Sequence, residues 1–229
     1  CQNGGDEFRP DIVIFINGLP FSYIEVKQPN AIRAGKTAIQ SEQSRTAVRF
    51  ENRRFRRFNN ITQLISFSDN LPYISGQGQQ KQGSFYCSNA FSKTKFNAFK
   101  EEREEELIYS IRSLGEEEID AVLKDVNRFA LKSQPEFKTN QDPSTPCNTF
   151  ISSLYQKERL LFLLRYGLAY VEEHSKDGTI QLQKHVMRYP QFFATKAIED
   201  AIGKGVKKGV IWHTQGSGKT ALSYFNIRY

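Results

Sequence analysis

Residues 213–220 combine the residue types that hold the phosphates of a nucleotide. Glycines let backbone N–H groups turn toward phosphate oxygens, a lysine reaches the outer phosphates, and the hydroxyl that follows can ligate Mg²⁺. His213 departs from the glycine or alanine that usually opens such a loop. The candidate contacts to the nucleotide are Gln215, Gly216, Ser217, Gly218, Lys219 and Thr220.

The flanks of this segment fit the strand, loop and helix that such a loop requires. Residues 209–212 are predicted to form a short buried strand, and residues 221–228 are predicted to form a helix. The chain has no initiator Met and stops soon after the loop, so we expect a chain that is cut at both ends. The acidic residue and the arginines that complete ATP hydrolysis would follow later, and we expect no ATP turnover by this chain alone.

A second group of residues with chemical potential lies near the start of the chain. Glu25 and Lys27 are two residues apart in a strand-like run, so their side chains share one face, and Asp11 follows a proline upstream. Carboxylates can hold Mg²⁺ against a phosphodiester, and a neighbouring lysine can orient water or offset developing charge. This pattern is weak by itself, because charged residues often alternate with apolar ones on a half-exposed strand.

The register of two strands decides whether Asp11 can join Glu25. Asn17-Gly18, between strand-like runs at 11–17 and 21–27, is a strong hairpin signal. A two-residue turn there would pair position 11 with position 24 and direct Asp11 away from Glu25. Pairing position 11 with position 25 requires a three-residue loop or a bulge near Asp11, and we expect one of the two.

The composition describes a folded, basic protein without a membrane segment. Apolar residues make up 38% of the 229 residues, which excludes a disordered chain, and the formal net charge of +7 suits a polyanionic partner. No apolar run approaches the roughly 20 residues of a membrane span, and no signal peptide is visible, which indicates a cytoplasmic protein. Cys1, Cys87 and Cys147 show no zinc-site spacing and are expected to be plain thiols.

Three segments are expected along the chain. Residues 1–100 are typical of an α/β domain, with strands expected at 61–68, 71–75 and 84–88 and an arginine-rich helical segment at 36–58, in which Arg45, Arg49 and Arg53 are spaced by four. Residues 101–185 read as a mostly helical connector with helices at 101–106, 116–129 and 157–166 and a proline-containing loop at 134–146. Residues 186–229 lead through a helix into the phosphate loop.

Seven short motifs match those of one known family, in the family's order along nearly the whole chain. They are RPDIV at 9–13, NGLP at 17–20, IEVKQP at 24–29, TPCN at 145–148, QKERLL at 156–161, RYPQ at 188–191 and WHTQGSGKT at 212–220. With these motifs the chain resembles the restriction (R) subunit of type I restriction enzymes, a family that also tolerates His213. The resemblance implies a PD-(D/E)xK endonuclease core, a mixed sheet flanked by helices, followed by the start of a RecA-like, superfamily 2 helicase-like ATP motor.

The resemblance also implies roles for the residues of the first group. Asp11 and Glu25 would bind Mg²⁺, with the Val26 carbonyl as a candidate third ligand, and Lys27 would be the catalytic lysine. Gln191 resembles the glutamine that reads the adenine edge of ATP in such motors.

One element of the family is altered in this chain. A Gln-x-x-x-Tyr pattern often follows on the next helix of the nuclease core. This chain offers Gln40 and Gln43, but Ser44 and Ala47 stand at the tyrosine positions, so the element is altered or shifted, and Gln40 is the candidate that we choose.

These inferences lead to a Mg²⁺-dependent double-stranded DNA endonuclease that is coupled, in the full protein, to ATP-driven DNA translocation. The resemblance implies methyltransferase and specificity subunits as partners. Two alternatives stay open: another nuclease-helicase of DNA repair or phage defence, and a DNA-binding assembly module with a degenerate nuclease.

Overall fold

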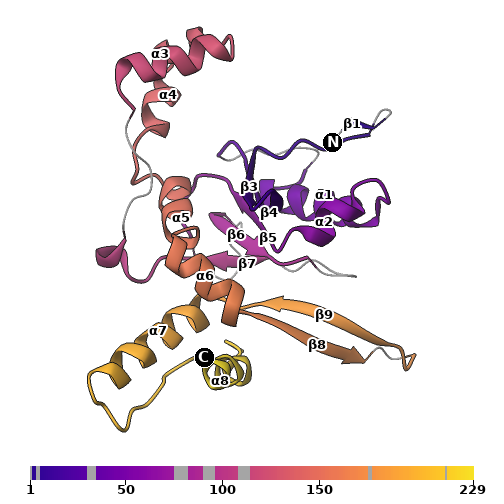
Figure 1. Cartoon of the computed structure of the whole chain (residues 1–229), viewed down its shortest axis with the longest axis vertical. Coiled ribbons are helices and arrows are strands. Elements are labelled where there is room, and N and C mark those ends of the chain that lie inside the picture. Colours follow the sequence, from indigo (N-terminus) through magenta and orange to yellow (C-terminus); the bar gives the residue numbers. More distant parts are fainter. Residues whose placement is uncertain are drawn as a thin grey trace.

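The computed structural model describes residues 2–3, 6–29, 35–74, 82–89, 96–107, 114–174, 177–214 and 216–229. A five-stranded sheet with the order β3-β4-β5-β6-β7 lies at its centre (Figure 1). The β4–β5 pair is parallel and the other pairs are antiparallel, so the sheet is mixed, and the predicted α/β class is confirmed. The strands are β3 (Ile12–Ile16), β4 (Leu19–Val26), β5 (Leu64–Ser68), β6 (Ser84–Cys87) and β7 (Asn97–Phe99). A separate pair, β1 (Gln2–Asn3) with β2 (Asp6–Glu7), precedes it.

Two helices make the crossover that the parallel pair β4–β5 requires. They are α1 (Ala38–Glu51) and α2 (Arg56–Ile61). A capping box starts α1, because the Gln40 N–H donates to the Thr37 hydroxyl at 3.3 Å and the Thr37 N–H donates to Gln40 Oε1 at 3.0 Å. The chain leaves α1 at Asn52, whose side chain accepts a hydrogen bond from the Arg54 N–H. The single helical face that we expected to extend to Arg53 therefore ends with α1.

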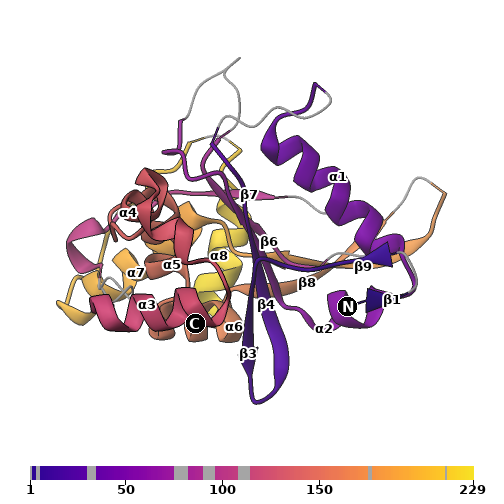
Figure 2. The ribbon, with the colours of Figure 1, turned by 90° about the horizontal axis from the view of Figure 1, so that it is seen from above.

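The two faces of the sheet carry different cores. Figure 2 shows α1 on one side of the sheet and α5 to α8 on the other. The core under α1 and α2 is aromatic, and Arg49 stacks over the Phe8 ring at 4.1 Å from its centroid. Its buried members are Phe8, Tyr23, Phe55, Ile65 and Cys87, with Ile39, Phe67 and Phe85 in a neighbouring group.

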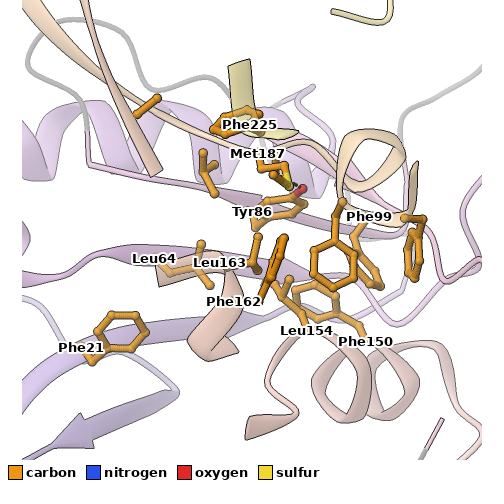
Figure 3. Packing of buried hydrophobic residues seen from close by; sticks show 14 residues of the cluster. Phe21, Leu64, Tyr86, Phe99, Phe150, Leu154, Phe162, Leu163, Met187 and Phe225 are labelled. Carbon is orange, nitrogen blue, oxygen red and sulfur yellow. Dashed lines mark hydrogen bonds between the residues drawn. The ribbon is translucent and has the colours of Figure 1, made fainter. Parts of the chain in front are cut away.

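The opposite face is covered by helices from the second half of the chain. These are α5 (Pro146–Leu154), α6 (Lys157–Tyr166), α7 (Tyr189–Gly203) and α8 (Lys219–Arg228). In Figure 3, Tyr86 of β6 lies beside Met187 within this core, and its hydroxyl donates to the Met187 carbonyl at 2.6 Å. Phe162 and Phe192 belong to the same cluster, which therefore joins all three predicted segments. The boundaries at residues 100 and 185 stay predictions.

The middle of the chain differs from its prediction in two places. The expected loop at 134–146 contains α4, because Pro135 and Pro146 occupy the first turns of α4 and α5, where proline is well tolerated. The last part of the connector is a hairpin of two strands that we did not predict, which projects from the molecule (Figure 1). The elements are η1 (Glu104–Glu106), α3 (Glu116–Asp125), η2 (Phe129–Ser133), α4 (Pro135–Asn140), β8 (Leu168–His174) and β9 (Ile180–Val186).

The predicted strand at 209–212 is wrong. Residues 206–214 have no regular structure, and Val210 and Trp212 are each 90% exposed. A strand is stable only when neighbours satisfy its backbone hydrogen bonds, and none of the strands in the described ranges pairs with this segment. Residues 71–74 are also irregular, and Ser75 lies outside the described residues. The helices predicted at 157–166 and 221–228 are confirmed by α6 and α8.

Two further predictions can be compared with the structure. Cys87 and Cys147 are free, buried thiols whose pKa values are raised by burial, and Cys1 lies outside the described residues. Among the helices in the described ranges, none is both long enough and apolar enough to cross a bilayer.

Candidate functional site

A two-residue turn closes the β3–β4 hairpin. Asn17 and Gly18 have φ angles of 50° and 78°, the left-handed values that such a turn requires. The three-residue loop that the sequence allowed is therefore wrong. Without a further change of register, this turn would direct Asp11 away from Glu25.

A β-bulge changes the register before the strands reach Asp11. The pairing shifts by one residue just beyond Ile14, and at the far end of the ladder Ile12 lies opposite Ile24. One step further along this register, Asp11 faces Glu25. The predicted bulge is confirmed, and it lies beside Ile14 rather than next to Asp11.

The backbone of β4 holds the Asp11 carboxylate in place. The Val26 N–H donates a hydrogen bond to Asp11 Oδ2 at 2.8 Å. The Asp11 side chain is 47% exposed, so it lies at the solvent boundary of the hairpin. The role predicted for the Val26 carbonyl stays a prediction.

Lys27 contacts the carboxylates of both strands. Its Nζ donates to Glu25 Oε2 at 2.6 Å and lies 3.8 Å from Asp11 Oδ2. The Lys27 N–H donates to the Ser68 carbonyl at 2.8 Å, which fixes the backbone at the end of β4. The structure therefore brings Asp11, Glu25 and Lys27 together, as the sequence predicted.

Glu42 of α1 is a member of this group that the sequence analysis missed. Its side chain is 2% exposed, and its Oε2 lies 3.6 Å from Lys27 Nζ. Burial raises the pKa of Glu42, and the nearby Arg49 opposes the rise. A signal existed in the sequence, because Ile39, Glu42 and Thr46 repeat at helical spacing and are all buried. That spacing places Glu42 on the face of α1 that packs against the sheet.

Arg49 connects the two buried carboxylates. It donates to Glu42 Oε1 at 2.8 Å and lies 3.3 Å from Glu25 Oε1. Its side chain is 15% exposed, and the stacking over Phe8 holds the guanidinium in one orientation. Arg49 is therefore a fixed part of the site.

These side chains surround an open cleft with a volume of about 490 Å³. Four of the residues that line it are cationic and two are carboxylates, so the cleft can receive an anionic phosphodiester beside a cation site. They are Arg9, Asp11, Glu25, Lys27, Arg45 and Arg49.

The donor set of the cleft fits a magnesium ion. In the described part of the chain no three His, Cys, Asp or Glu residues form a ready metal-binding group. Mg²⁺ does not require one, because proteins usually hold it by one or two carboxylates while water and substrate phosphate supply the remaining ligands. Asp11 and Glu25 offer two, and Glu25 Oε1 is a buried oxygen without a hydrogen-bond partner among the described residues.

Gln40 is not brought to this cleft. Its backbone and side chain both form the capping box with Thr37, and the residue is exposed at the start of α1. The structure thus assigns Gln40 to the helix terminus, two residues before Glu42, which lies on the buried face of α1.

The two glycines of the predicted phosphate loop have left-handed φ angles, which glycine adopts without strain. Gly216 and Gly218 have φ angles of 77° and 83°, and Gly218 is the N-cap of α8, which begins at Lys219. Lys219 and Thr220 are exposed. Gln215 lies outside the described residues.

Gln191 contacts this loop directly. Its side chain accepts a hydrogen bond from the Arg188 N–H at 2.9 Å and donates to the Gly218 carbonyl at 3.0 Å. The Arg188 guanidinium donates to the Gly216 carbonyl at 3.3 Å. Ser217 Oγ is buried and has no hydrogen-bond partner among the described residues. A cavity of about 1070 Å³ adjoins the loop and is lined by Arg188, Gly216 and Ser217 together with residues of the 206–214 segment.

Comparisons with known proteins match two parts of the chain to two families. Residues 1–105 match the family described as type I restriction enzyme R protein N terminus, and residues 190–229 match the SWI2/SNF2 ATPase family. No solved structure matches the chain.

Three relatives from Methanocaldococcus jannaschii are described as type I restriction enzyme endonuclease subunits. The MjaVIIP subunit is 43% identical over 76 residues, covering 31% of this chain and 7% of the relative. The MjaIXP subunit is 23% identical over 226 residues, covering 95% of this chain and 18% of the relative. The chain thus spans less than a fifth of the length of these relatives. These matches support assigning the chain to the type I restriction enzyme R subunits, with the family model itself covering residues 1–105.

Proposed function

We propose that the first hundred residues form a Mg²⁺-dependent endonuclease with a PD-(D/E)xK, restriction-endonuclease-like core. The observation that carries the proposal is the position of Lys27 Nζ, 2.6 Å from Glu25 and 3.8 Å from Asp11. A lysine beside two carboxylates in an open basic cleft is the arrangement that hydrolysis of a phosphodiester requires.

Each residue of the cleft has a defined part in this proposal. Asp11 and Glu25 hold Mg²⁺, which when bound polarises the phosphodiester and makes a coordinated water more acidic. Lys27 orients the attacking water or offsets the charge that develops on the phosphate. Arg49 offsets the charge of the two buried carboxylates, so that they can stay close together.

The substrate that we propose is double-stranded DNA. Arg9 and Arg45 line the cleft, and Arg53, Arg56 and Arg57 are exposed on the segment that follows α1. Arginines at such positions contact phosphates whatever the base sequence. Sequence recognition would then belong to a specificity subunit, and modification to a methyltransferase subunit, as partners of the complete enzyme.

Residues 186–229 are proposed to begin a RecA-like motor that binds ATP and drives DNA translocation in the full protein. The match of residues 190–229 to SWI2/SNF2 ATPases and the left-handed Gly216 and Gly218 support this assignment. Gln191, which is predicted to read the adenine edge, is linked to the loop by its hydrogen bond to the Gly218 carbonyl.

Plasmid cleavage by the assembled restriction enzyme tests the nuclease proposal. With Mg²⁺ or Mn²⁺, Lys27→Ala is expected to lower the cleavage rate by about 100-fold or more, as loss of a proton-transfer or charge-stabilising group does. Lys138→Ala, which changes an exposed lysine of α4, is the matched control and should cleave like wild type. Equal cleavage by wild type and Lys27→Ala would favour a DNA-binding assembly module instead.

A further inference from the structure

The Lys27 ammonium lies among three carboxylates. Its Nζ is 2.6 Å from Glu25 Oε2, 3.6 Å from Glu42 Oε2 and 3.8 Å from Asp11 Oδ2. An ammonium and a divalent cation seek the same carboxylate oxygens. A metal ion that engages Asp11 Oδ2 and Glu25 Oε2 therefore competes with the Lys27 ammonium for both oxygens.

Glu42 offers the Lys27 ammonium a second carboxylate to bind. Its Oε1 accepts from Arg49 at 2.8 Å, whereas its Oε2 is buried and has no hydrogen-bond partner among the described residues. This oxygen is within a small side-chain movement of Lys27 Nζ. A buried oxygen without a hydrogen bond is unfavourable, and of the two cations beside it the Lys27 ammonium, at 3.6 Å, is nearer than the Arg45 guanidinium, at 3.8 Å.

Lys27 rather than Arg49 is the cation that can move. Arg49 is held between Glu25, Glu42 and the Phe8 ring. Lys27 has a flexible four-carbon side chain that is 22% exposed, and it lines the open cleft. A shift of its ammonium from Glu25 to Glu42 keeps it beside the cleft.

We propose that Glu42 is the positioning residue for Lys27: when a metal ion engages Asp11 and Glu25, the Lys27 ammonium binds Glu42 Oε2. Glu42 thereby reduces the competition between the ammonium and the metal, and it keeps Lys27 next to the phosphodiester. This inference rests on the proposed nuclease function.

A double-mutant cycle on metal affinity tests the inference without using cleavage. Mn²⁺ binding to the assembled enzyme is titrated, without nucleotide or DNA, for wild type, Glu42→Gln, Lys27→Ala and the double variant. Glu42→Gln is expected to weaken Mn²⁺ binding by about 10-fold when Lys27 is present, and by less than about 2-fold when Lys27 is replaced by Ala, because coupled residues are not additive. Glu51→Gln, an exposed position on the same helix, is the matched control and should leave the affinity unchanged.

Two results would overturn the inference. Equal weakening in both backgrounds would mean that Glu42 acts on the metal directly, and no weakening in either would mean that Glu42 does not assist Lys27. Thermal unfolding of each variant identifies loss of folding. If Glu42→Gln does not fold, Glu42→Asp keeps the charge and is expected to weaken Mn²⁺ binding less than about 10-fold, again only when Lys27 is present.

Failure of the proposed function itself would give a different result. Glu25→Gln removes a proposed ligand, so it should abolish the binding event that the cycle measures. If Glu25→Gln binds Mn²⁺ like wild type, the cleft has no such metal site. A metal site lost in Glu25→Gln but insensitive to Glu42→Gln would reject only the role of Glu42.

Discussion

The cleft around Glu25 and the proposed phosphate loop around Gly218 would contact a phosphate group with different parts of the polypeptide. The cleft uses charged side chains, and each of the strands and helices that carry them pairs or packs within the described chain. The loop uses backbone groups and depends on glycines with left-handed φ angles. The segment before it is exposed and unpaired within the described ranges.

This difference shows how far each site is already organised by contacts among the described residues. The cleft has its charges already opposed at close range, with Arg49 2.8 Å from Glu42 and Lys27 2.6 Å from Glu25. The loop has left-handed glycines, but Lys219 and Thr220 are exposed, and neither lines the cavity of about 1070 Å³ next to Gly216. We therefore expect substitutions in the cleft to affect chemistry, and substitutions in the loop to affect conformation first.

The largest expected effect is on cleavage by Asp11→Asn and by Glu25→Gln. An amide keeps the size of the side chain but cannot hold a cation as a carboxylate does, so cleavage by the assembled enzyme should fall by about 1000-fold. Asp125→Asn, at an exposed position in α3, is the control and should cleave normally. Cleavage retained by Glu25→Gln would show that the cleft does not act through its carboxylates.

The next effect concerns the loop and compares two glycines with the same φ angle. Gly218 and Gly178 both have φ of 83°, but a Cβ on Gly218 would lie 2.5 Å from Gln191 Nε2, whereas nothing lies within 4 Å of one on Gly178. Gly218→Ala should weaken binding of a fluorescent ATP analogue by about 10-fold, because the loop must change shape. Gly178→Ala should lower stability by about 1 kcal/mol without changing nucleotide affinity. Equal nucleotide binding by both variants would exclude a role for the loop conformation.

A smaller effect tests whether the two regions are connected energetically. Tyr86→Phe removes the 2.6 Å hydrogen bond from the sheet to the Met187 carbonyl, next to the segment that carries Arg188 and Gln191. It should lower the free energy of unfolding by about 1–2 kcal/mol, since a buried carbonyl loses its partner. Tyr224→Phe, at a 48% exposed position, should have little effect in the same denaturant titration. A neutral Tyr86→Phe would indicate that the carbonyl finds another donor.

The smallest effect lies at the junction of the β8–β9 hairpin with the sheet. Lys184 is buried, donates to the side-chain oxygens of Gln63 and Asn89, and has its pKa lowered by burial to about 8. Above pH 8 the folded protein releases this proton while the unfolded chain keeps it up to about pH 10.4, so stability gains from Lys184 as the pH rises. Between pH 7 and 9 the melting temperature of wild type should rise by about 2 °C relative to that of Lys184→Gln. A parallel pH profile for the two proteins would contradict a buried, partly neutral Lys184.

The side-chain site could be predicted from the sequence because its residues lie within one hairpin. Alternation along β4 places Glu25 and Lys27 on one face, and the requirement for Asp11 on that face predicted the bulge. Glu42 was missed because it comes from a helix, where its spacing with Ile39 and Thr46 was the available sign that it points inward. Gln40 was selected by analogy, but the backbone of the helix terminus uses its side chain.

The errors elsewhere share a physical cause. A local sequence pattern does not show which other segments of the chain it will pair or pack with. The apolar residues at 209–212 resemble a strand, but a strand requires neighbours. Prolines at 135 and 146 suggested a loop, but the first turn of a helix accepts proline readily. The β8–β9 hairpin was not predicted because its exposed faces mix charged and apolar residues without a clear alternation along the sequence.

Because of the bulge beside Ile14, the placement of Asp11 opposite Glu25 depends more on the register of the hairpin than on the identity of its residues. A regular ladder without the bulge, with the same turn and the same residues, would pair Asp11 with Ile24. Asp11 and Glu25 would then project from opposite faces, and no substitution at either position could reunite them. Replacements along the hairpin can therefore leave this arrangement intact, whereas a change of register that pairs Phe21, the residue left unpaired at the bulge, would separate the two carboxylates.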